Sequence, residues 1–156
     1  MRAVVQRVKR AEVCVCGSSV GSCRKGFLIL LGVEKGDAEE DALLLAAKLS
    51  KLRIFEDEQG KMNLALRDVG GELLVVSNFT LCADCRHGNR PDYFRAEEPG
   101  KAKVLYEFFT DRIREMAGCR TETGVFGADM EISLINDGPV TVILASEELK
   151  KRKDNL

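Results

Sequence analysis

The chain has 156 residues, of which 45% are hydrophobic, and a formal net charge of −1. A chain of this length forms one domain and buries about two-thirds of its unfolded surface. Its charge excludes a general attraction to nucleic acid, so any RNA contact must be local. The uninterrupted apolar runs, such as residues 27–31, are too short to span a membrane, and no long apolar stretch follows the first basic residues. We therefore expect a cytoplasmic protein.

The first part of the chain predicts strands. Residues 2–8 and 11–16 alternate between apolar and polar, which indicates two strands with a tight connection at Lys9 and Arg10. Residues 17–22 are rich in Gly and Ser and predict a turn. Residues 27–33 are apolar on both faces, which is typical of a central, buried strand.

A helix is expected next. Asp37 and Glu40 have the spacing of a capping box before an apolar face of 3.6-residue period. The residues of that face are Ala42, Leu45, Ala46, Leu49 and Leu52. A short strand over residues 53–55 and a turn over residues 58–61 follow.

The middle of the chain predicts a strand, a long loop and a second helix. Residues 72–80 form the strand, and residues 82–98 are polar and irregular, as functional loops often are. Pro99 suits the first turn of the second helix, and Gly118 suits its end. The apolar face of this helix is Leu105, Phe108, Phe109, Ile113 and Met116.

Two last strands, residues 130–135 and 140–145, are joined through Asn136, Asp137, Gly138 and Pro139. The predicted order is three strands, a helix, two strands, a helix and two strands. This order predicts a mixed α/β fold, without the glycine pattern of a dinucleotide-binding unit. We expect one domain over residues 1–156, with curved, barrel-like β-sheets and two packing helices outside.

Cysteine chemistry has weak support in the sequence. Six cysteines in a chain without a secretion signal are expected to be free thiols. Cys82 and Cys85 have the spacing of a zinc or redox pair, and His87 follows them. A structural zinc site needs a second ligand pair, which the sequence lacks, so we expect no metal and no cofactor.

A side-chain triad is also weakly supported. Ser77 or Thr80 could act as a nucleophile only with a base in hydrogen-bond reach. His87 is the single histidine, and Asp84 or Asp92 could orient it, but no nucleophile elbow surrounds either hydroxyl. From the residues alone, the function stays open.

Two short segments of small polar residues lie at the edges of apolar runs, where backbone donors can form a binding site on a rigid support. They are Ser77-Asn78-Phe79-Thr80-Leu81 and Asn136-Asp137-Gly138-Pro139-Val140-Thr141. Together they resemble the two signatures of the D-aminoacyl-tRNA deacylases. Further matching pieces are residues 2–8, 26–32, 52–57, 90–91 and 124–130, so the resemblance runs along the whole chain.

The resemblance implies an activity and an assembly. Members of that family are homodimers that hydrolyse the ester between a D-amino acid and the terminal adenosine of tRNA, and they also remove glycine from mischarged tRNA. It implies that a cis Gly138-Pro139 step reaches into the site of the neighbouring subunit and rejects L-amino acids. The alternative that we keep open is a non-catalytic tRNA-binding module with the same fold.

The resemblance also implies roles for single residues. Ser77, Phe79 and Thr80 would form the catalytic segment, with the backbone N–H groups of Phe79 and Thr80 facing the ester. Asn78 stands where the family usually has Gln, which puts its side-chain contact in doubt.

Two residues outside the first signature have an implied role and a plain alternative. Arg7 would brace the Gly138-Pro139 segment or be an exposed strand charge, and Met130 would line the pocket or belong to the core.

Basic residues form three clusters, and the first, at the start of the chain, is a candidate for a local RNA contact and consists of Arg2, Arg7, Lys9 and Arg10. Arg86, His87, Arg90 and Arg95 follow the first signature and are candidates for a local RNA contact. Residues 150–153 are all Lys or Arg, and we expect them to be a solvated tail.

Overall fold

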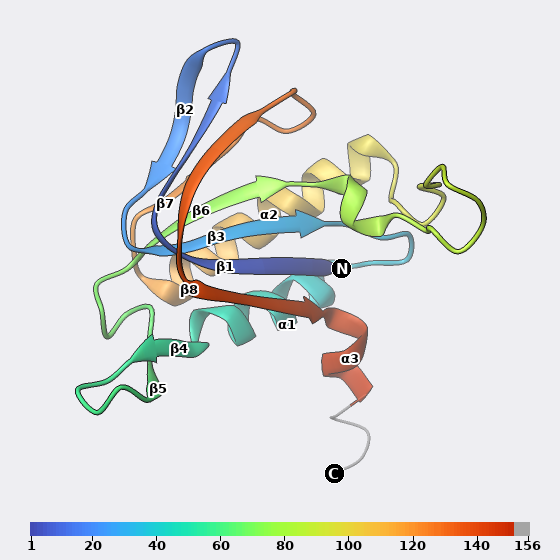
Figure 1. Ribbon diagram of the computed structural model, residues 1–156. Helices are drawn as coiled ribbons and strands as arrows, with labels where there is room; N and C mark the ends of the chain where they lie inside the picture. Colours follow the sequence, from blue (N-terminus) through green and yellow to red (C-terminus); the bar gives the residue numbers. More distant parts are fainter. Residues whose placement is uncertain (152–156) are drawn as a thin grey trace.

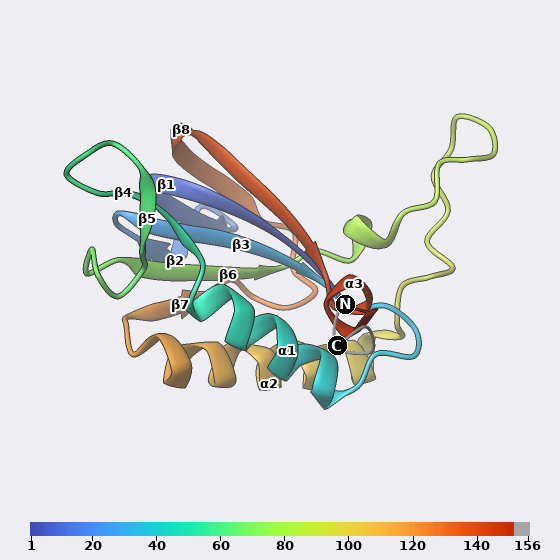
Figure 2. The same ribbon diagram turned by 90° about the horizontal axis from the view of Figure 1, so that it is seen from below.

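The computed structural model describes residues 1–151 and shows a mixed α/β fold with both long helices on one face of a curved sheet (Figures 1 and 2). Within this range, no helix is long and apolar enough to cross a membrane. The elements are β1 (Arg2–Val15), β2 (Ser18–Cys23), β3 (Gly26–Gly32), α1 (Glu39–Ser50), β4 (Arg53–Glu56), β5 (Met62–Ala65), β6 (Glu72–Ser77), the 3₁₀ helix η1 (Phe79–Cys82), α2 (Pro99–Ala117), β7 (Thr121–Thr123), β8 (Glu131–Ala145) and α3 (Ser146–Lys151).

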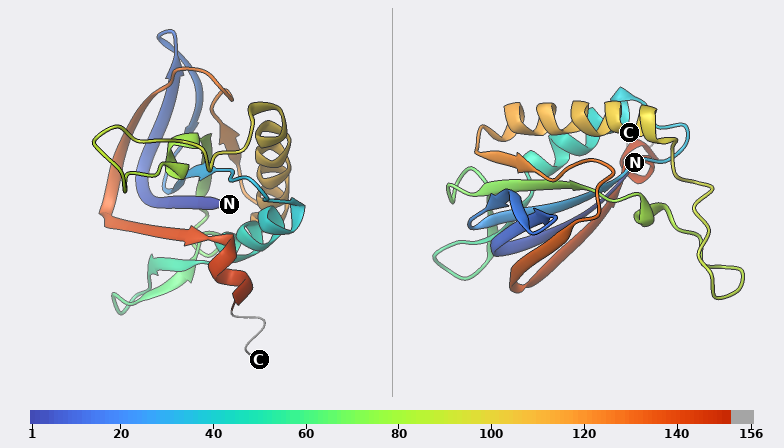
Figure 3. Two further views of the ribbon diagram at one scale, coloured as in Figure 1. Left: turned by 90° about the vertical axis from the view of Figure 1, so that its right-hand side faces the viewer. Right: turned by 90° about the horizontal axis from the view of Figure 1, so that it is seen from above.

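The large sheet is almost closed on itself. Its strand order is β2-β1-β3-β6-β7, and β8 pairs with the other side of β1. The sheet curls until β2 meets β7, where the backbone N–H of Ser22 donates to Glu122 Oε2 at 2.7 Å (Figure 3). Gly21 permits this approach, because a Cβ atom there would lie 2.3 Å from the carbonyl oxygen of Thr123. The barrel-like α/β fold predicted from the sequence is therefore confirmed.

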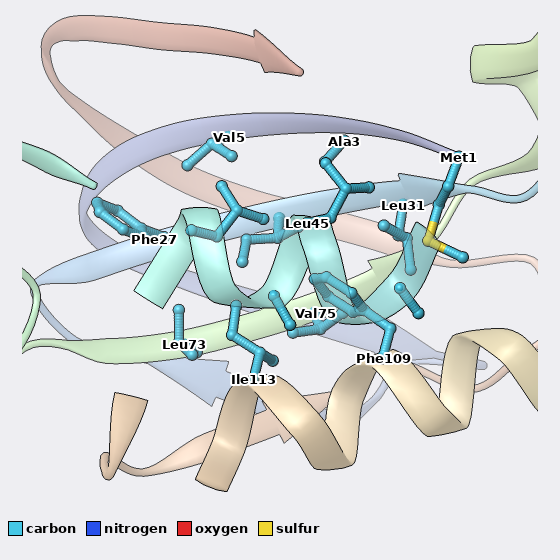
Figure 4. Packing of buried hydrophobic residues seen from close by; sticks show 14 of the residues in the cluster. Met1, Ala3, Val5, Phe27, Leu31, Leu45, Leu73, Val75, Phe109 and Ile113 are labelled. Atoms are coloured by element: carbon cyan, nitrogen blue, oxygen red, sulfur yellow. The ribbon is translucent and has the colours of Figure 1, made fainter. Parts of the chain in front are cut away.

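Two apolar cores lie on the two faces of this sheet. The larger core packs the sheet against α1 and α2, with Phe27, Leu45 and Phe109 at its centre (Figure 4). The smaller core fills the concave side and contains Leu28 and Leu74. Neighbouring residues of β3 thus enter different cores, which explains why this strand is apolar on both faces, as predicted.

The N-terminal hairpin differs from the prediction. β1 is one continuous strand, and Lys9 and Arg10 lie within it instead of forming a connection. The turn is at Cys16 and Gly17, whose φ angles of 49° and 78° fit a two-residue hairpin. The predicted turn at residues 17–22 is largely strand β2, because pairing with β1 overrides the weak propensity of its Ser and Gly residues.

The predicted capping box of α1 is wrong. Asp41, not Glu40, makes the capping bond, because its Oδ2 accepts from the backbone N–H of Ala38 at 3.1 Å. Asp37 instead binds the Met1 ammonium group at 2.5 Å and the backbone N–H of Glu34 at 2.6 Å. The four predicted apolar residues that belong to α1, from Ala42 to Leu49, are buried. The fifth, Leu52, lies beyond the end of the helix at Ser50.

The second helix agrees better with its prediction. α2 begins at Pro99, and Gly118 ends it in the left-handed region with φ of 62°. Met116 was expected to be buried, but it is 41% exposed. Ala117 and Tyr106 occupy the buried face instead.

Several other helix and strand boundaries also differ from the prediction. The strand expected over residues 72–80 stops at Ser77, and the two last predicted strands form one strand, β8. The short elements β5, β7 and α3 were not predicted. Lys150 is exposed to solvent as expected, but it belongs to α3 and its ammonium group binds Asp41 at 2.7 Å, while residues 152–153 lie outside the described residues.

Candidate functional site

The end of β6 is held rigidly against β3. The backbone N–H of Asn78 donates to the carbonyl oxygen of Leu31 at 2.8 Å, and η1 starts at the next residue. Gly32 allows this approach, because a Cβ atom there would lie 3.1 Å from the Asn78 carbonyl oxygen. A buried strand thus delivers the segment of residues 77–80 to a fixed place, which we call the strand tip.

A pocket of about 650 Å³ opens beside the strand tip, and its size is typical of a small-molecule site. Its walls come from the strand tip, from the loop before α2, from α2 itself and from the start of β8. Residues that line it include Ser77, Asn78, Phe79, Tyr93, Tyr106 and Met130.

Met130 reaches the pocket because of a glycine. A Cβ atom on Gly124 would lie 2.6 Å from Met130 Sδ, so the glycine leaves room for the Met130 side chain in its present position. Met130 is half-buried and packs against the smaller core while it lines the pocket. Both sequence interpretations of Met130 therefore describe part of its environment.

The strand tip has unused backbone donors. Within residues 1–151, the backbone N–H groups of Phe79 and Thr80 have no acceptor, and no side chain caps η1. The Thr80 hydroxyl donates to Asn78 Oδ1, which fixes both side chains at the mouth of the pocket. The donors needed to stabilise a developing negative charge are therefore present beside the pocket.

Two ionisable side chains of the pocket, Glu97 and Tyr106, are bonded to other groups of the protein. Glu97 binds the Lys101 ammonium group at 2.8 Å, and this bond lowers the pKa of Glu97. Burial raises the pKa of Tyr106 to about 12, and its hydroxyl donates to the Val75 carbonyl oxygen at 2.8 Å. At neutral pH Glu97 is thus a weak base and Tyr106 stays neutral.

The triad hypothesis gains no geometric support. His87 is exposed on the loop beyond the strand tip and, among residues 1–151, makes no hydrogen bond to Ser77 or Thr80. Asp84 is held by the Arg86 guanidinium, which lowers the pKa of that carboxyl group.

Cys82 and Cys85, the candidate zinc or redox pair, differ in their exposure to solvent. Cys82 is buried with its Sγ 3.5 Å from the Val33 carbonyl oxygen, and burial raises the pKa of its thiol to about 11. Cys85 is exposed. In the part of the chain that is described, no three His, Cys, Asp or Glu side chains lie close enough to hold a metal ion.

Gly138 and Pro139 form a separate exposed feature in the middle of β8. Gln6 pairs with Thr141 and Val8 with Asn136, so two steps along β1 correspond to five along β8. The extra residues bulge out of the ladder, and we call residues 137–140 the β8 bulge. The peptide bond between Gly138 and Pro139 is cis, and Gly138 has φ of 126°.

Arg7 holds this bulge from below. It is only 5% exposed, so it is not the exposed strand charge that we kept as an alternative. Its Nε donates to the Asp137 carbonyl oxygen at 3.0 Å, and its Nη1 donates to the Ile54 carbonyl oxygen at 2.6 Å. The same Nε lies 3.5 Å from Asp137 Oδ2.

The bulge is remote from the pocket of its own chain. Arg7 pairs with Phe27 on β3, whereas Ser77 pairs with Leu31, four residues further along. Three strand spacings, from β8 across β1 and β3 to β6, are added to this offset. At about 3.3 Å per residue and about 4.8 Å per strand, the separation is on the order of 20 Å.

Comparison with known proteins decides the family. The family model described as D-Tyr-tRNA(Tyr) deacylase matches residues 4–145. The chain belongs to this family. A D-aminoacyl-tRNA deacylase from Anaeromyxobacter dehalogenans is 57% identical over 149 residues, covering 96% of this chain and 99% of the relative. One from Geobacter sulfurreducens is 56% identical over 144 residues, covering 92% and 94%.

Solved structures show the same fold for this deacylase-family chain. A structure named c-Myc DNA Unwinding Element Binding Protein superposes with a TM-score of 0.86 at 37% identity, covering 92% of this chain and 97% of that one. A probable eukaryotic D-amino acid tRNA deacylase gives a TM-score of 0.78 over the same shares at 15% identity, and this likeness concerns the fold alone.

The sequence-based site residues of this family member fall into two groups. Ser77, Asn78, Phe79 and Met130 line one pocket with Thr80 beside them, whereas Arg7, Gly138 and Pro139 lie together at the bulge.

The pocket residues that were missed include three with polar side chains: Tyr93, Glu97 and Tyr106. A tyrosine on the apolar face of α2 is the signal that could have indicated Tyr106, since a buried hydroxyl needs a partner.

Proposed function

We propose that the protein hydrolyses the ester between a D-amino acid and the terminal adenosine of tRNA, and also removes glycine attached to tRNA(Ala). Family membership supports an esterase of this substrate class. The observation that carries the proposal is a pocket whose mouth presents two backbone N–H groups that have no acceptor among residues 1–151. Charged tRNA as the substrate supports a cytoplasmic location.

The strand tip would supply electrostatic stabilisation. As water attacks the ester, the carbonyl oxygen becomes negative, and the N–H groups of Phe79 and Thr80 would donate to it. Loss of one donor of this kind typically costs on the order of 3 kcal/mol of barrier. The 2′-hydroxyl of the terminal adenosine, which the resemblance suggests as an assisting group, would suit a pocket without a base of its own.

Thr80 and Asn78 would position the substrate. The Thr80 hydroxyl already donates to Asn78 Oδ1, so its proton is engaged and no base stands ready to remove it. The Asn78 side chain, where the family usually has Gln, keeps a definite partner in this chain. This partner supports the view that the substitution is accommodated within the site.

Selection against L-amino acids would need a second copy of the chain. The β8 bulge is exposed and too far from its own pocket to touch the substrate there, so the bulge of a partner would form the wall. Its main-chain carbonyl groups would face the α-carbon of the amino acid. A hydrogen atom fits against such a wall, whereas an L side chain collides with it, and rejection by collision discriminates strongly.

The edge of the sheet supports this homodimer. β8 pairs only with β1, so its other edge is unpaired over residues 1–151. Ile143 is 72% exposed and Ile135 is 43% exposed on the same strand. Long unpaired edges with apolar side chains favour association with another chain.

Rates on D-Tyr-tRNA and L-Tyr-tRNA, with Gly-tRNA(Ala) as a further substrate, test the proposal. We expect rapid release of D-tyrosine and glycine and a rate on L-Tyr-tRNA close to the spontaneous one. Equal rates on D- and L-Tyr-tRNA, or no cleavage of either, would refute the proposal.

Complementation tests the shared site. A variant with a damaged strand tip and a variant with a damaged bulge are each expected to be inactive. After unfolding and refolding together, mixed dimers should regain activity at one of their two sites. No recovery in proven mixed dimers would argue against a bulge that acts in the partner.

A non-catalytic nucleic-acid-binding protein is the second candidate. Asn78 in place of the usual Gln favours it, as does the name of the 37%-identical structure, which refers to binding of a DNA element. Tight tRNA binding without any ester cleavage would favour this candidate over the enzyme.

A further inference from the structure

The loop beyond the strand tip projects as an arm. Residues 84–92 leave the body next to the pocket, and Figure 2 shows this yellow-green loop standing well away from the sheet. A pair of backbone hydrogen bonds closes its base, from Asp84 N–H to the Asp92 carbonyl oxygen at 2.9 Å and in reverse at 3.0 Å. The arm is therefore a defined feature and not an irregular extension of the pocket wall.

The two acids of the arm are used at its base, whereas its tip is basic. Asp84 accepts from the backbone N–H of Arg86 at 3.0 Å and from its Nε at 2.9 Å, and Asp92 accepts from Phe94 N–H at 3.3 Å. Residues 85–91 hold Arg86, His87 and Arg90 and no acidic residue.

Arg90 has no structural role that explains it. Among residues 1–151 its side chain has no ion-pair or hydrogen-bond partner, unlike Arg86 and Arg95, which bind Asp84 and Glu34. A cation that the fold does not use is available to a ligand.

An exposed aromatic side chain lies where the arm rejoins the body. Phe94 is 78% exposed, although a large apolar side chain normally avoids water. The preceding residue, Tyr93, lines the pocket and packs edge-on against Phe79 with ring centroids 5.1 Å apart. Phe94 is thus the next aromatic ring along the chain from the rim of the pocket.

We propose that Arg86, His87, Arg90 and Phe94, here called the arm patch, bind the single-stranded 3′ end of tRNA. Phe94 stacks on a base upstream of the terminal adenosine, and Arg90, whose guanidinium has no partner among residues 1–151, binds an adjoining phosphate. Aromatic rings beside cations are the usual means of holding a single strand. The overall charge of −1 requires such a local cluster.

This inference rests on the proposed function and says how the enzyme holds the polynucleotide outside the pocket. Two substrates separate the two claims. D-Tyr-tRNA carries the 3′ strand, whereas D-tyrosyl-adenosine ends at the part that fills the pocket. Affinity for uncharged tRNA is measured as well, because it needs no catalysis.

The variants are Arg90→Gln, Phe94→Ala and their combination, since neither residue makes a side-chain bond that the fold needs. We expect about a tenfold rise in the KM for D-Tyr-tRNA and in the Kd for uncharged tRNA in the double variant, because one base stack is worth about that factor. kcat and the hydrolysis of D-tyrosyl-adenosine should not change. The slope of log Kd against log salt should fall by about 1 for each lost phosphate contact.

The matched control is Lys61→Gln, an exposed charge in the turn between β4 and β5, at the opposite end of the molecule (Figure 1). It should leave both tRNA parameters unchanged. An unchanged tRNA Kd in the double variant overturns the arm patch, and so does an equal loss on both substrates.

Two more results separate the claims. A DNA oligonucleotide that competes as well as an RNA oligonucleotide with the tRNA 3′ sequence overturns the assignment to tRNA. If the wild type cleaves neither substrate, the proposed function fails, while the Kd comparison still decides the arm patch.

Discussion

The strand tip and the β8 bulge achieve rigidity in opposite ways. The tip is the end of a buried central strand, and the N–H groups of Phe79 and Thr80 are left unpaired because the ladder stops before them. The bulge interrupts an edge strand, and a buried side chain, Arg7, holds it from beneath. The strand tip is thus positioned by the hydrogen bonds of the sheet, whereas the bulge leaves those hydrogen bonds and is positioned by the side chain of Arg7.

This difference indicates which properties each region controls. The tip lies in its own pocket, so its groups can act within a single chain. The bulge lies on the order of 20 Å from that pocket, so it is proposed to act only in the pocket of another copy of the chain. Changes at the tip should therefore alter the rate, whereas changes at the bulge should alter the rate and the selectivity together.

The largest expected effect is the loss of one backbone donor at the tip. Phe79→Pro removes the N–H at a position where proline is tolerated, because Phe79 opens η1 and Asn78 has extended backbone angles, with φ of −147° and ψ of 90°. We expect kcat to fall by about 100- to 1,000-fold. Phe79→Ala keeps the N–H and should lose much less. Equal losses in single-turnover assays would show that the ring, not the donor, matters.

The bulge is probed by Gly138→Ala. A Cβ atom at Gly138 would lie 2.9 Å from Val140 Cγ2, at a φ of 126° that an L-residue rarely adopts. We expect about a 100-fold loss on D-Tyr-tRNA and a smaller ratio between D and L rates, since small displacements of a positioned group are costly.

Gly60→Ala is its control, because Gly60 has φ of 73° and open space around it. It should lose some thermal stability but no selectivity. A fully active and selective Gly138→Ala enzyme would remove the bulge from the site.

Much of the fold follows from apolar periodicity. β3, β6 and the faces of α1 and α2 have strong patterns and were predicted, apart from Met116. β2, β5 and β7 are short and have little pattern of their own, so pairing with neighbours determines them. Tertiary pairing is not visible in a single local stretch of sequence.

The site was predictable to a different degree in its two regions. The strand tip and Met130 were named from motifs, and the pocket indeed brings them together. Tyr93 and Glu97 come from an irregular loop without a signal. The separation of Gly138 from Ser77 depends on register and strand order, which no motif contains.

Arg7 is expected to contribute both to the position of the bulge and to the free energy of unfolding. Arg7→Gln should remove its hydrogen bonds to the Asp137 and Ile54 carbonyl oxygens and leave both acceptors poorly satisfied. We expect a loss of about 3 kcal/mol in the free energy of unfolding, together with weaker selectivity. Urea unfolding measures it, with Arg10→Gln, an exposed charge on the same strand, as the control. A stable but unselective variant would separate the two effects of Arg7.

The opposite end of β6 provides a contrast with the strand tip. Glu72 accepts from the Arg24 backbone N–H at 2.8 Å and from Arg24 and Arg120 side chains, and the backbone bond is the main cause of its lowered pKa. This stabilisation is present above the ordinary value of 4.5 and is lost as the pH falls through the lower folded value.

We expect Glu72→Gln to cost about 2 kcal/mol at neutral pH. The difference from the wild type should shrink as the pH falls below 4.5. The exposed Glu58→Gln serves as the control. A difference that is independent of pH would mean that packing, not charge, holds this end of the strand.

The smallest effect is expected at the hydroxyl group of Thr80. Its proton is engaged by Asn78 Oδ1, and no base among residues 1–151 is bonded to it, so Thr80→Ala should lower kcat by only about tenfold. Removal of a true nucleophile would cost up to about a millionfold. Thr80→Ser keeps the hydroxyl and should retain nearly full activity. Complete loss in Thr80→Ala with normal folding and tRNA affinity would make the side chain a nucleophile. A tenfold loss, beside a far larger one in Phe79→Pro, would mean that the main chain stabilises the charge at the tip, just as the main chain is proposed to judge handedness at the bulge.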